Sequence, residues 1–189
     1  MVGAMSALPL SFLLRWLGGD RSATAADGGA ETETVRRIAA RLEQLPPERA
    51  RFLAAFAYVL ARVAHADLHI SETETAAMQE AVAGVAGLAP EETALAVEIA
   101  KSQARLLGGT ENYVVTRRFR ELSQREERVR LVECLYAVAA ADGTISRAES
   151  AEIARISEEL GFLPAEAIAI RAPWRDQLAE FQGLPRSDG

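Results

Sequence analysis

The sequence contains one internal repeat, which restricts the fold more than any other feature. Residues 57–78 read AYVLARVAHADLHISETETAAM, and residues 132–153, at an offset of 75, read VECLYAVAAADGTISRAESAEI. The matching pairs are Leu60 and Leu135, Val63 and Val138, Asp67 and Asp142, Ile70 and Ile145, Ser71 and Ser146, and Glu74 and Glu149. A single unit of this size cannot bury its own apolar face. The repeat therefore predicts two helix-loop-helix units that pack about a pseudo-twofold axis into one closed domain.

Apolar residues recur along the chain at intervals of three and four, the spacing of a helix face. These series are Val35, Ile38 and Leu42; Phe52, Phe56, Val59 and Val63; Met78, Val82 and Val85; Leu95, Ile99 and Leu106; Leu131, Leu135 and Val138; and Ile153, Ile156 and Leu160. No segment alternates every second residue for long enough to favour a strand. The prediction is an all-α fold, a compact bundle of about seven or eight helices.

Composition excludes several classes of protein. The chain has 189 residues, of which 49% are hydrophobic and 25% charged, as expected for a single globular domain with a tail. A net charge of -6 argues against a nucleic-acid partner. The single cysteine, Cys134, excludes an internal disulfide and a cysteine-rich metal site. We expect a cytoplasmic protein, with membrane association left open.

The first 32 residues differ from the rest. Residues 8–17 (LPLSFLLRWL) form an apolar segment with helical spacing, and residues 18–32 are small and polar, as in a flexible linker. Because no basic residue precedes the apolar run and Arg15 interrupts it, a secretory signal is disfavoured. The alternatives are a helix docked on its own domain or on another subunit, and an anchor to a partner or a membrane surface.

The remaining domain limits follow from the repeat. We expect a helical domain at residues 33–183, with the repeats at about 50–107 and 123–182, and a tail at 184–189.

The loop of the second copy carries a recognisable pattern. Residues 141–149 read Ala-Asp-Gly-x-Ile-Ser-x-x-Glu between two predicted helices. This pattern resembles the TerB-like family, named for bacterial tellurite-resistance proteins; related domains occur at the front of some membrane-anchored DnaJ-type co-chaperones. The first copy departs from it, with Leu68-His69 in place of Gly143-Thr144. The resemblance covers about residues 33–183 and implies a cytoplasmic helical domain of stress or metal-oxyanion resistance, without a known catalytic activity.

Three Ser-x-x-Glu segments fit the capping box, in which a serine hydroxyl and a glutamate carboxylate satisfy the first amides of a helix. They are Ser71 with Glu74, Ser146 with Glu149, and Ser123 with Glu126.

A divalent-metal site is the alternative for the same loops. The resemblance carries Asp67, Glu74, Asp142 and Glu149 onto recurring acidic positions of the family. The first copy adds His65 and His69, and imidazole with carboxylate suits Zn, Ni or Cu. An Asp at the end of a helix is unfavourable for the helix dipole, so a turn hydrogen bond, an arginine or a cation must hold it. For Asp142, turn formation by Asp-Gly is the simpler explanation.

The charges separate along the chain. Residues 65–100 hold seven acids and no Lys or Arg, whereas residues 117–130 hold six Arg and three Glu. The two readings are pairing or solvation within the domain, and a polarised interaction surface. The candidate basic interaction patch is Arg117, Arg118, Arg120 and Arg125.

No nucleophile–base pair, phosphate-binding glycine loop or cofactor motif is present, and Cys134 lies on an apolar face typical of a core. The sequence therefore favours a non-catalytic interaction or sensor domain, a partner-binding adaptor in a stress or tellurite response. The alternatives are a divalent-metal-binding protein and a membrane-peripheral adaptor anchored by residues 8–17. A protein partner is expected, and a homo-oligomer is left open.

Overall fold

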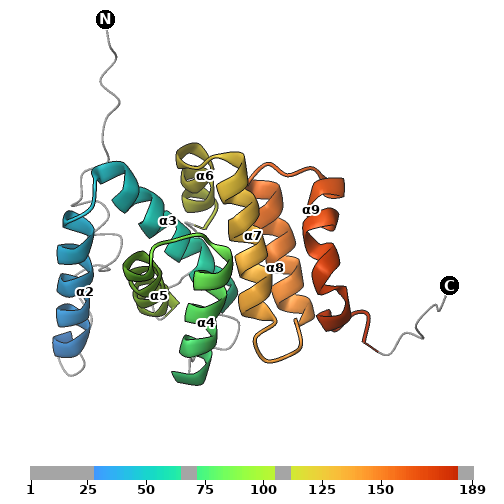
Figure 1. The fold of residues 1–189 in the computed structure, drawn as a ribbon, viewed down its shortest axis with the longest axis horizontal. Coiled ribbons are helices and arrows are strands. Elements are labelled where there is room, and N and C mark those ends of the chain that lie inside the picture. Colours follow the sequence, from blue (N-terminus) through green and yellow to red (C-terminus); the bar gives the residue numbers. More distant parts are fainter. Residues whose placement is uncertain (1–27, 65–71, 105–111, 183–189) are drawn as a thin grey trace, which may run out of the picture.

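The computed structural model describes residues 28–64, 72–104 and 112–182, and this part of the chain is helical (Figure 1). Its elements in chain order are α2 (Gly28–Glu43), α3 (Pro47–Ala64), α4 (Glu72–Val85), α5 (Pro90–Ala104), α6 (Asn112–Leu122), α7 (Arg125–Ala139), α8 (Arg147–Glu159), α9 (Pro164–Arg171) and the 3-10 helix η2 (Ala172–Gln177). Within these ranges the only β pairing is an isolated bridge between Ile145 and Leu178. The prediction of an all-α bundle is confirmed.

Helix α3 forms the centre of the bundle. All twelve residues from Phe52 to Val63 are buried, so α3 is covered on every side, and it packs against α2, α5, α6, α7 and α8. Alanine at several of these positions lets the neighbouring helix axes approach closely. The aromatic part of the core lies where α3 meets α6, with the ring of Phe119 5.2 Å from Phe52 and 6.2 Å from Phe56.

The two repeats occupy equivalent places in the fold. One consists of α3, α4 and α5, and the other of α7, α8 and α9 with η2. Helix α4 packs against α7, while α8 packs against α3, so the second helix of each unit covers the first helix of the other. This exchange of partners is what a pseudo-twofold arrangement requires. It explains why the matching apolar residues are retained in both copies.

The third helices of the two units differ. Helix α5 is continuous, whereas α9 gives way to η2 at Ala172, directly before Pro173. Proline lacks an amide hydrogen, so Pro173 cannot donate the backbone hydrogen bond that would continue the α-helix. The proline therefore shortens the last α-helix of the second unit.

The N-terminal boundary differs from the expectation. Helix α2 begins at Gly28, inside the segment 18–32 that we expected to be a linker. The reason is that Ala30 and Glu31, directly after the glycine pair, are good helix formers, and an acidic residue in a first turn favours the helix dipole. The predicted helix at residues 8–17, the linker residues 18–27 and the tail 184–189 lie outside the described residues.

The turns after α4 and α8 are built alike. Gly87 and Gly161 have φ angles of 65° and 85°, the left-handed conformation that favours glycine. A Cβ atom would lie 2.9 Å from Nη1 of Arg130 at Gly87, and 2.6 Å from Cζ of Arg120 at Gly161. Each turn therefore needs glycine both for its backbone conformation and for the arginine packed on it.

Replacing Gly161 by alanine should destabilise the domain by about 1–2 kcal/mol, because a side chain is strained at a left-handed residue and Arg120 must also move. Gly84, near the end of α4, has open space where its Cβ would lie. As the matched control, Gly84→Ala should raise stability, by about 0.5 kcal/mol. Urea unfolding followed by circular dichroism measures both, and equal effects of the two substitutions would contradict this account of the turn.

Candidate functional site

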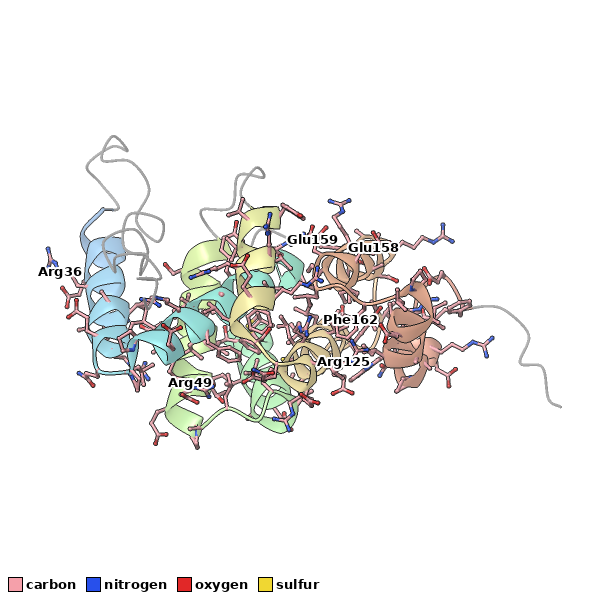
Figure 2. All side chains as sticks on the ribbon, turned by 90° about the horizontal axis from the view of Figure 1, so that it is seen from above. Arg36, Arg49, Arg125, Glu158, Glu159 and Phe162 are labelled. Carbon is pink, nitrogen blue, oxygen red and sulfur yellow. The ribbon has the colours of Figure 1, made fainter. Side chains whose placement is uncertain are left out.

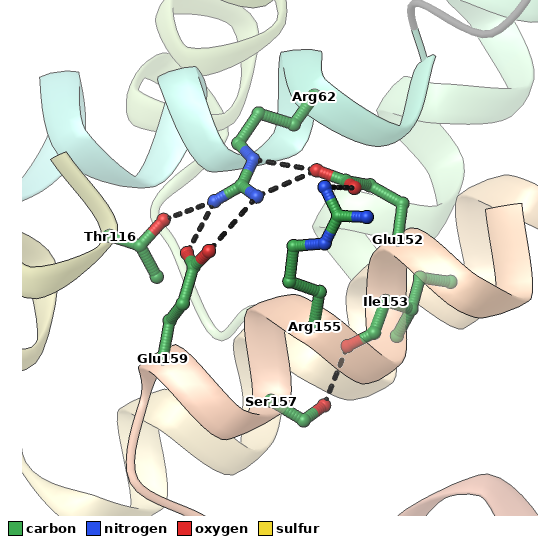
Figure 3. A network of polar contacts seen from close by, with 7 residues as sticks. All are labelled: Arg62, Thr116, Glu152, Ile153, Arg155, Ser157 and Glu159. Atoms are coloured by element: carbon green, nitrogen blue, oxygen red, sulfur yellow. Dashed lines mark hydrogen bonds and ion pairs between the residues drawn. The ribbon is translucent and has the colours of Figure 1, made fainter. Parts of the chain in front are cut away.

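A buried arginine joins three helices at the middle of the molecule. The side chain of Arg62, on α3, is 1% exposed, and Glu152 and Glu159 of α8 and Thr116 of α6 surround it (Figure 3). Its Nη1 donates to Glu159 Oε2 at 2.6 Å and to Thr116 Oγ1 at 2.5 Å. Its Nε and Nη2 donate to Glu152 Oε1 at 2.9 and 2.6 Å. We call these four residues the Arg62 cluster.

The glutamates of the Arg62 cluster stabilise the charged form of the arginine. Burial opposes the positive charge of Arg62, but hydrogen bonds and charge from Glu159 and Glu152 outweigh it and raise the pKa of the guanidinium above its ordinary value. Arg155 adds a second cation, with Nη1 3.4 Å from Glu152 Oε2. A permanently charged arginine cannot transfer protons at neutral pH, so the cluster's chemistry suits holding helices together.

The sequence analysis missed the Arg62 cluster. A signal was present, because Arg62 is the only charged residue in the apolar run from Phe52 to Val63. A charge inside a fully buried helix requires partners from other helices. The identity of those partners could not be read from the sequence, since they lie 54 to 97 residues away.

The loop of the second repeat is held by backbone hydrogen bonds. Ser146 Oγ accepts from the amide of Glu149 at 3.2 Å, and the amide of Ser146 donates to Glu149 Oε2 at 2.8 Å, so the capping box is present. Asp142 Oδ1 accepts from the amide of Thr144 at 3.0 Å, which closes the Asp-Gly turn. Both carboxylates proposed as metal ligands in this copy therefore bind backbone amides.

The metal hypothesis is tested only in part. The described residues include no group of three or more His, Cys, Asp or Glu side chains that could hold a metal ion. His65, Asp67, His69 and Ser71 lie outside the described residues, and Glu74 is described only as part of the backbone of α4. The site proposed for the first copy, together with its capping box, remains a prediction.

A comparison with protein families shows to which family the chain belongs. The family model described as tellurite resistance protein TerB matches residues 53–172, from α3 to the start of η2. The chain belongs to the TerB family. No curated protein and no solved structure shows significant similarity to it. The match contains most of both repeats and all four residues of the Arg62 cluster, so these features lie within the TerB domain.

The third predicted capping box of the TerB domain is wrong. Helix α7 starts at Arg125, so its cap is Gln124, whose amide donates to Glu127 Oε2 at 2.8 Å. Ser123 is buried and donates to the carbonyl of Phe119 at 2.7 Å, which closes α6, and Glu126 is exposed. The predicted cap was displaced by one residue. The Ser123 hydroxyl binds a carbonyl at the end of α6, so the cap of α7 falls on the next residue, Gln124.

Two acidic residues of α5, Glu92 and Glu98, pair with arginines of α2 and α3. Arg49 of α3 donates to both carboxylate oxygens of Glu92 at 2.6 Å, and Arg37 and Arg41 of α2 contact Glu98 at 2.6 and 3.1 Å. The hydrogen bonds from Arg49 hold the pKa of the Glu92 carboxyl below its ordinary value against the effect of burial. These acids therefore hold α2 and α3 to α5 and do not pair with residues 117–130.

The four arginines of the predicted basic patch have different environments. Arg117 and Arg118 contact Glu121 on the same helix. Arg125 pairs with Glu166 and lies beside Phe162, with its Cζ 5.3 Å from the ring (Figure 2). Arg120 packs on Gly161. The patch is thus partly neutralised, and the side chain of Arg117, 65% exposed, is the most accessible of those that form ion pairs.

Two further observations concern the single cysteine and the length of the helices. Cys134 is buried, and burial raises the pKa of its thiol to about 12, so this cysteine is not a nucleophile at neutral pH. Among the helices described here, none is both long enough and apolar enough to span a membrane.

Replacing Arg62 by methionine should lower the free energy of unfolding by about 3–5 kcal/mol, because it leaves Glu152 and Glu159 without their buried counter-ion. Arg155 contacts the same Glu152 but is 67% exposed. The matched control, Arg155→Met, should cost less than about 1 kcal/mol, as for surface ion pairs. Chemical unfolding of both variants tests this, and a mild effect of Arg62→Met would show that the cluster does not hold the helices.

The Glu92–Arg49 pair should give stability that depends on pH. Because the folded pKa of Glu92 is lowered, its contribution is full above the unfolded pKa and is lost as the pH falls through the folded value. Glu92→Gln should therefore destabilise the protein at pH 7, and its difference from wild type should shrink below about pH 4. The control is Glu91→Gln, at an exposed neighbour whose carboxylate forms no ion pair in the part of the chain described here. A difference from wild type that stays unchanged as the pH is lowered from 7 to well below 4 would contradict the prediction.

Proposed function

We propose that this TerB domain is a non-catalytic, partner-binding adaptor in a bacterial tellurite or related stress response, and that it binds its partner through the outer face of α6. The family connects the chain with tellurite resistance. The role of adaptor, the partner and the binding face are our inference from the surface and the interior of the domain.

The composition of the α6 surface carries the proposal. Tyr113 is 57% exposed and Val114 is 63% exposed, and they stand one turn before Arg117 on the same helix. Tyrosine and arginine are enriched in protein interfaces, and large exposed side chains that gather on one helix mark binding surfaces. The arginine and the two apolar side chains together suit a protein partner with an apolar surface bordered by acidic groups.

The interior supports a non-catalytic role. The buried charges of the Arg62 cluster are paired with one another, and the carboxylates of Asp142 and Glu149 accept from backbone amides. Cys134 is a neutral thiol of the core. These groups are therefore committed to structure, whereas Tyr113, Val114 and Arg117 on the α6 surface are largely exposed.

The double variant Val114→Glu/Arg117→Glu should abolish the contribution of the protein to tellurite resistance, because it places two negative charges on the face that we expect to meet an acidic partner. The measurement is growth on graded tellurite in a native host that lacks its own copy and carries the wild type or a variant. Arg36→Glu, on the exposed side of α2, is the control and should behave as wild type.

Thermal unfolding of the purified variants should show that both remain folded. Full resistance with the double variant would exclude the α6 surface. Failure of the wild type itself to raise resistance would exclude the tellurite response as the role of this domain.

A further inference from the structure

The outer face of α9 is apolar and uncovered. The exposed residues along α9 and its two ends are Leu163, Pro164, Ala165, Ile168, Ala169, Ala172 and Pro173, and none carries a charge. Leu163 is 66% exposed and Ile168 is 60% exposed. Helix α9 lies at the end of the bundle opposite to α2 (Figure 1), and none of its residues is fully buried. We call this set of residues the α9 strip.

The pseudo-twofold arrangement shows that a cover is missing from this strip. In the first unit the third helix, α5, packs between α3 and α2. In the second unit the third helix, α9, packs against α7 and α8, and within the described ranges no helix takes the place that α2 takes on α5. The α9 strip therefore corresponds to a face that is covered by a helix in the other half of the same domain.

We propose that the α9 strip pairs with the α9 strip of a second copy, with the two helices antiparallel, to form a weak symmetric dimer. This proposal concerns α9 and does not depend on the partner proposed for Tyr113, Val114 and Arg117 of α6. A twofold interface brings the same residues of both copies together, so its surface must be complementary to itself.

The order of residues along the strip meets this requirement. An antiparallel pair centred between Ile168 and Ala169 places Ala165 opposite Ala172 and Ile168 opposite Ala169. The alanines let the two helices approach closely, and each isoleucine lies against a small residue, which is how facing positions pack best. Leu163 extends the apolar contact at each end.

Charges beyond the ends of the strip complement one another. Asp176, exposed in η2, follows the C-terminal end of the strip, and Gly161 precedes its N-terminal end, so an antiparallel pair brings Asp176 of one copy to the same end as Gly161 of the other. The guanidinium of Arg120 lies on Gly161. Asp176 and Arg120 form no ion pair elsewhere in the described part of the chain, so the dimer would supply each with an opposite charge, twice by symmetry.

The neighbouring arginines do not oppose this pairing. Arg125, beside Phe162, is compensated by Glu166, and Arg175 stacks on Phe181 of its own chain, 5.3 Å from the ring centre. The strip is about 12 Å long at the rise of an α-helix. A contact of this size belongs to the weak class of interfaces, so we expect association that depends strongly on concentration.

The test is sedimentation equilibrium of the full chain over a wide concentration range. The wild type should associate reversibly to a dimer, and Ile168→Glu should lower the association constant at least tenfold. Ala40→Glu is the control, because it places the same charge on an exposed residue of α2, at the other end of the bundle from α9. It should associate as the wild type does.

A charge exchange tests the register. Asp176→Arg alone should weaken association several-fold, and Arg120→Asp in the same chain should restore it. Circular dichroism confirms that each variant is folded, which matters for Arg120 because it packs on Gly161.

Three results would overturn the proposal. They are a wild type that stays monomeric at every concentration, an Ile168→Glu variant that associates as the wild type does, and association that is lost on Leu13→Glu/Leu14→Glu. The last result would assign the contact to the apolar segment 8–17, which has the apolar residues to cover the strip in place of a second copy.

Discussion

The structure depends on the buried positive charge of Arg62, which is paired with two glutamates. Arg62 stands near the end of the central helix, and its five donors reach a threonine on α6 and two glutamates on α8. These contacts tie the first helix of one repeat to the second helix of the other, through the helix that connects the two repeats along the chain. Apolar packing alone is non-directional, so it fixes the position of α8 on α3 less tightly than hydrogen bonds do. A planar guanidinium with two fixed carboxylates fits in one way.

The same ion-pairing principle operates at the N-terminal side with less burial. Glu92 and Glu98 on α5 receive arginines from α3 and α2, and these contacts attach α2 to the domain. In the acidic stretch of residues 65–100, two of the four acids whose side chains the structure describes, Glu92 and Glu98, thus hold helices together. The arginine-rich stretch is divided in a similar way between contacts along α6, a pair with α9, and the glycine turns that end α4 and α8. The net charge of the chain therefore says little about its partners.

Prediction from the sequence succeeded where the information is local. The spacing of Phe52, Phe56, Val59 and Val63 places one face of a helix in the core, and Ser146 with Glu149 begins α8 as its spacing requires. It failed by one residue at Ser123, because two helices there compete for a single serine and tertiary burial decides the outcome. It failed entirely for the Arg62 cluster, whose members are distant in sequence. Pairing of that kind is set by the packing of helices, which no spacing rule encodes.

The buried cysteine has a consequence for the conditions under which this protein can work. Cys134 is the only cysteine of the chain, and it lies in the core as a protonated thiol. Oxidation of cysteine proceeds through an accessible thiolate. The protein therefore presents no reactive thiol to an oxidant and cannot form a mixed disulfide without opening its core, so this cysteine keeps one covalent state when the redox balance around it changes. Oxidation of cysteine is therefore not a route by which an oxidative stress would alter this domain.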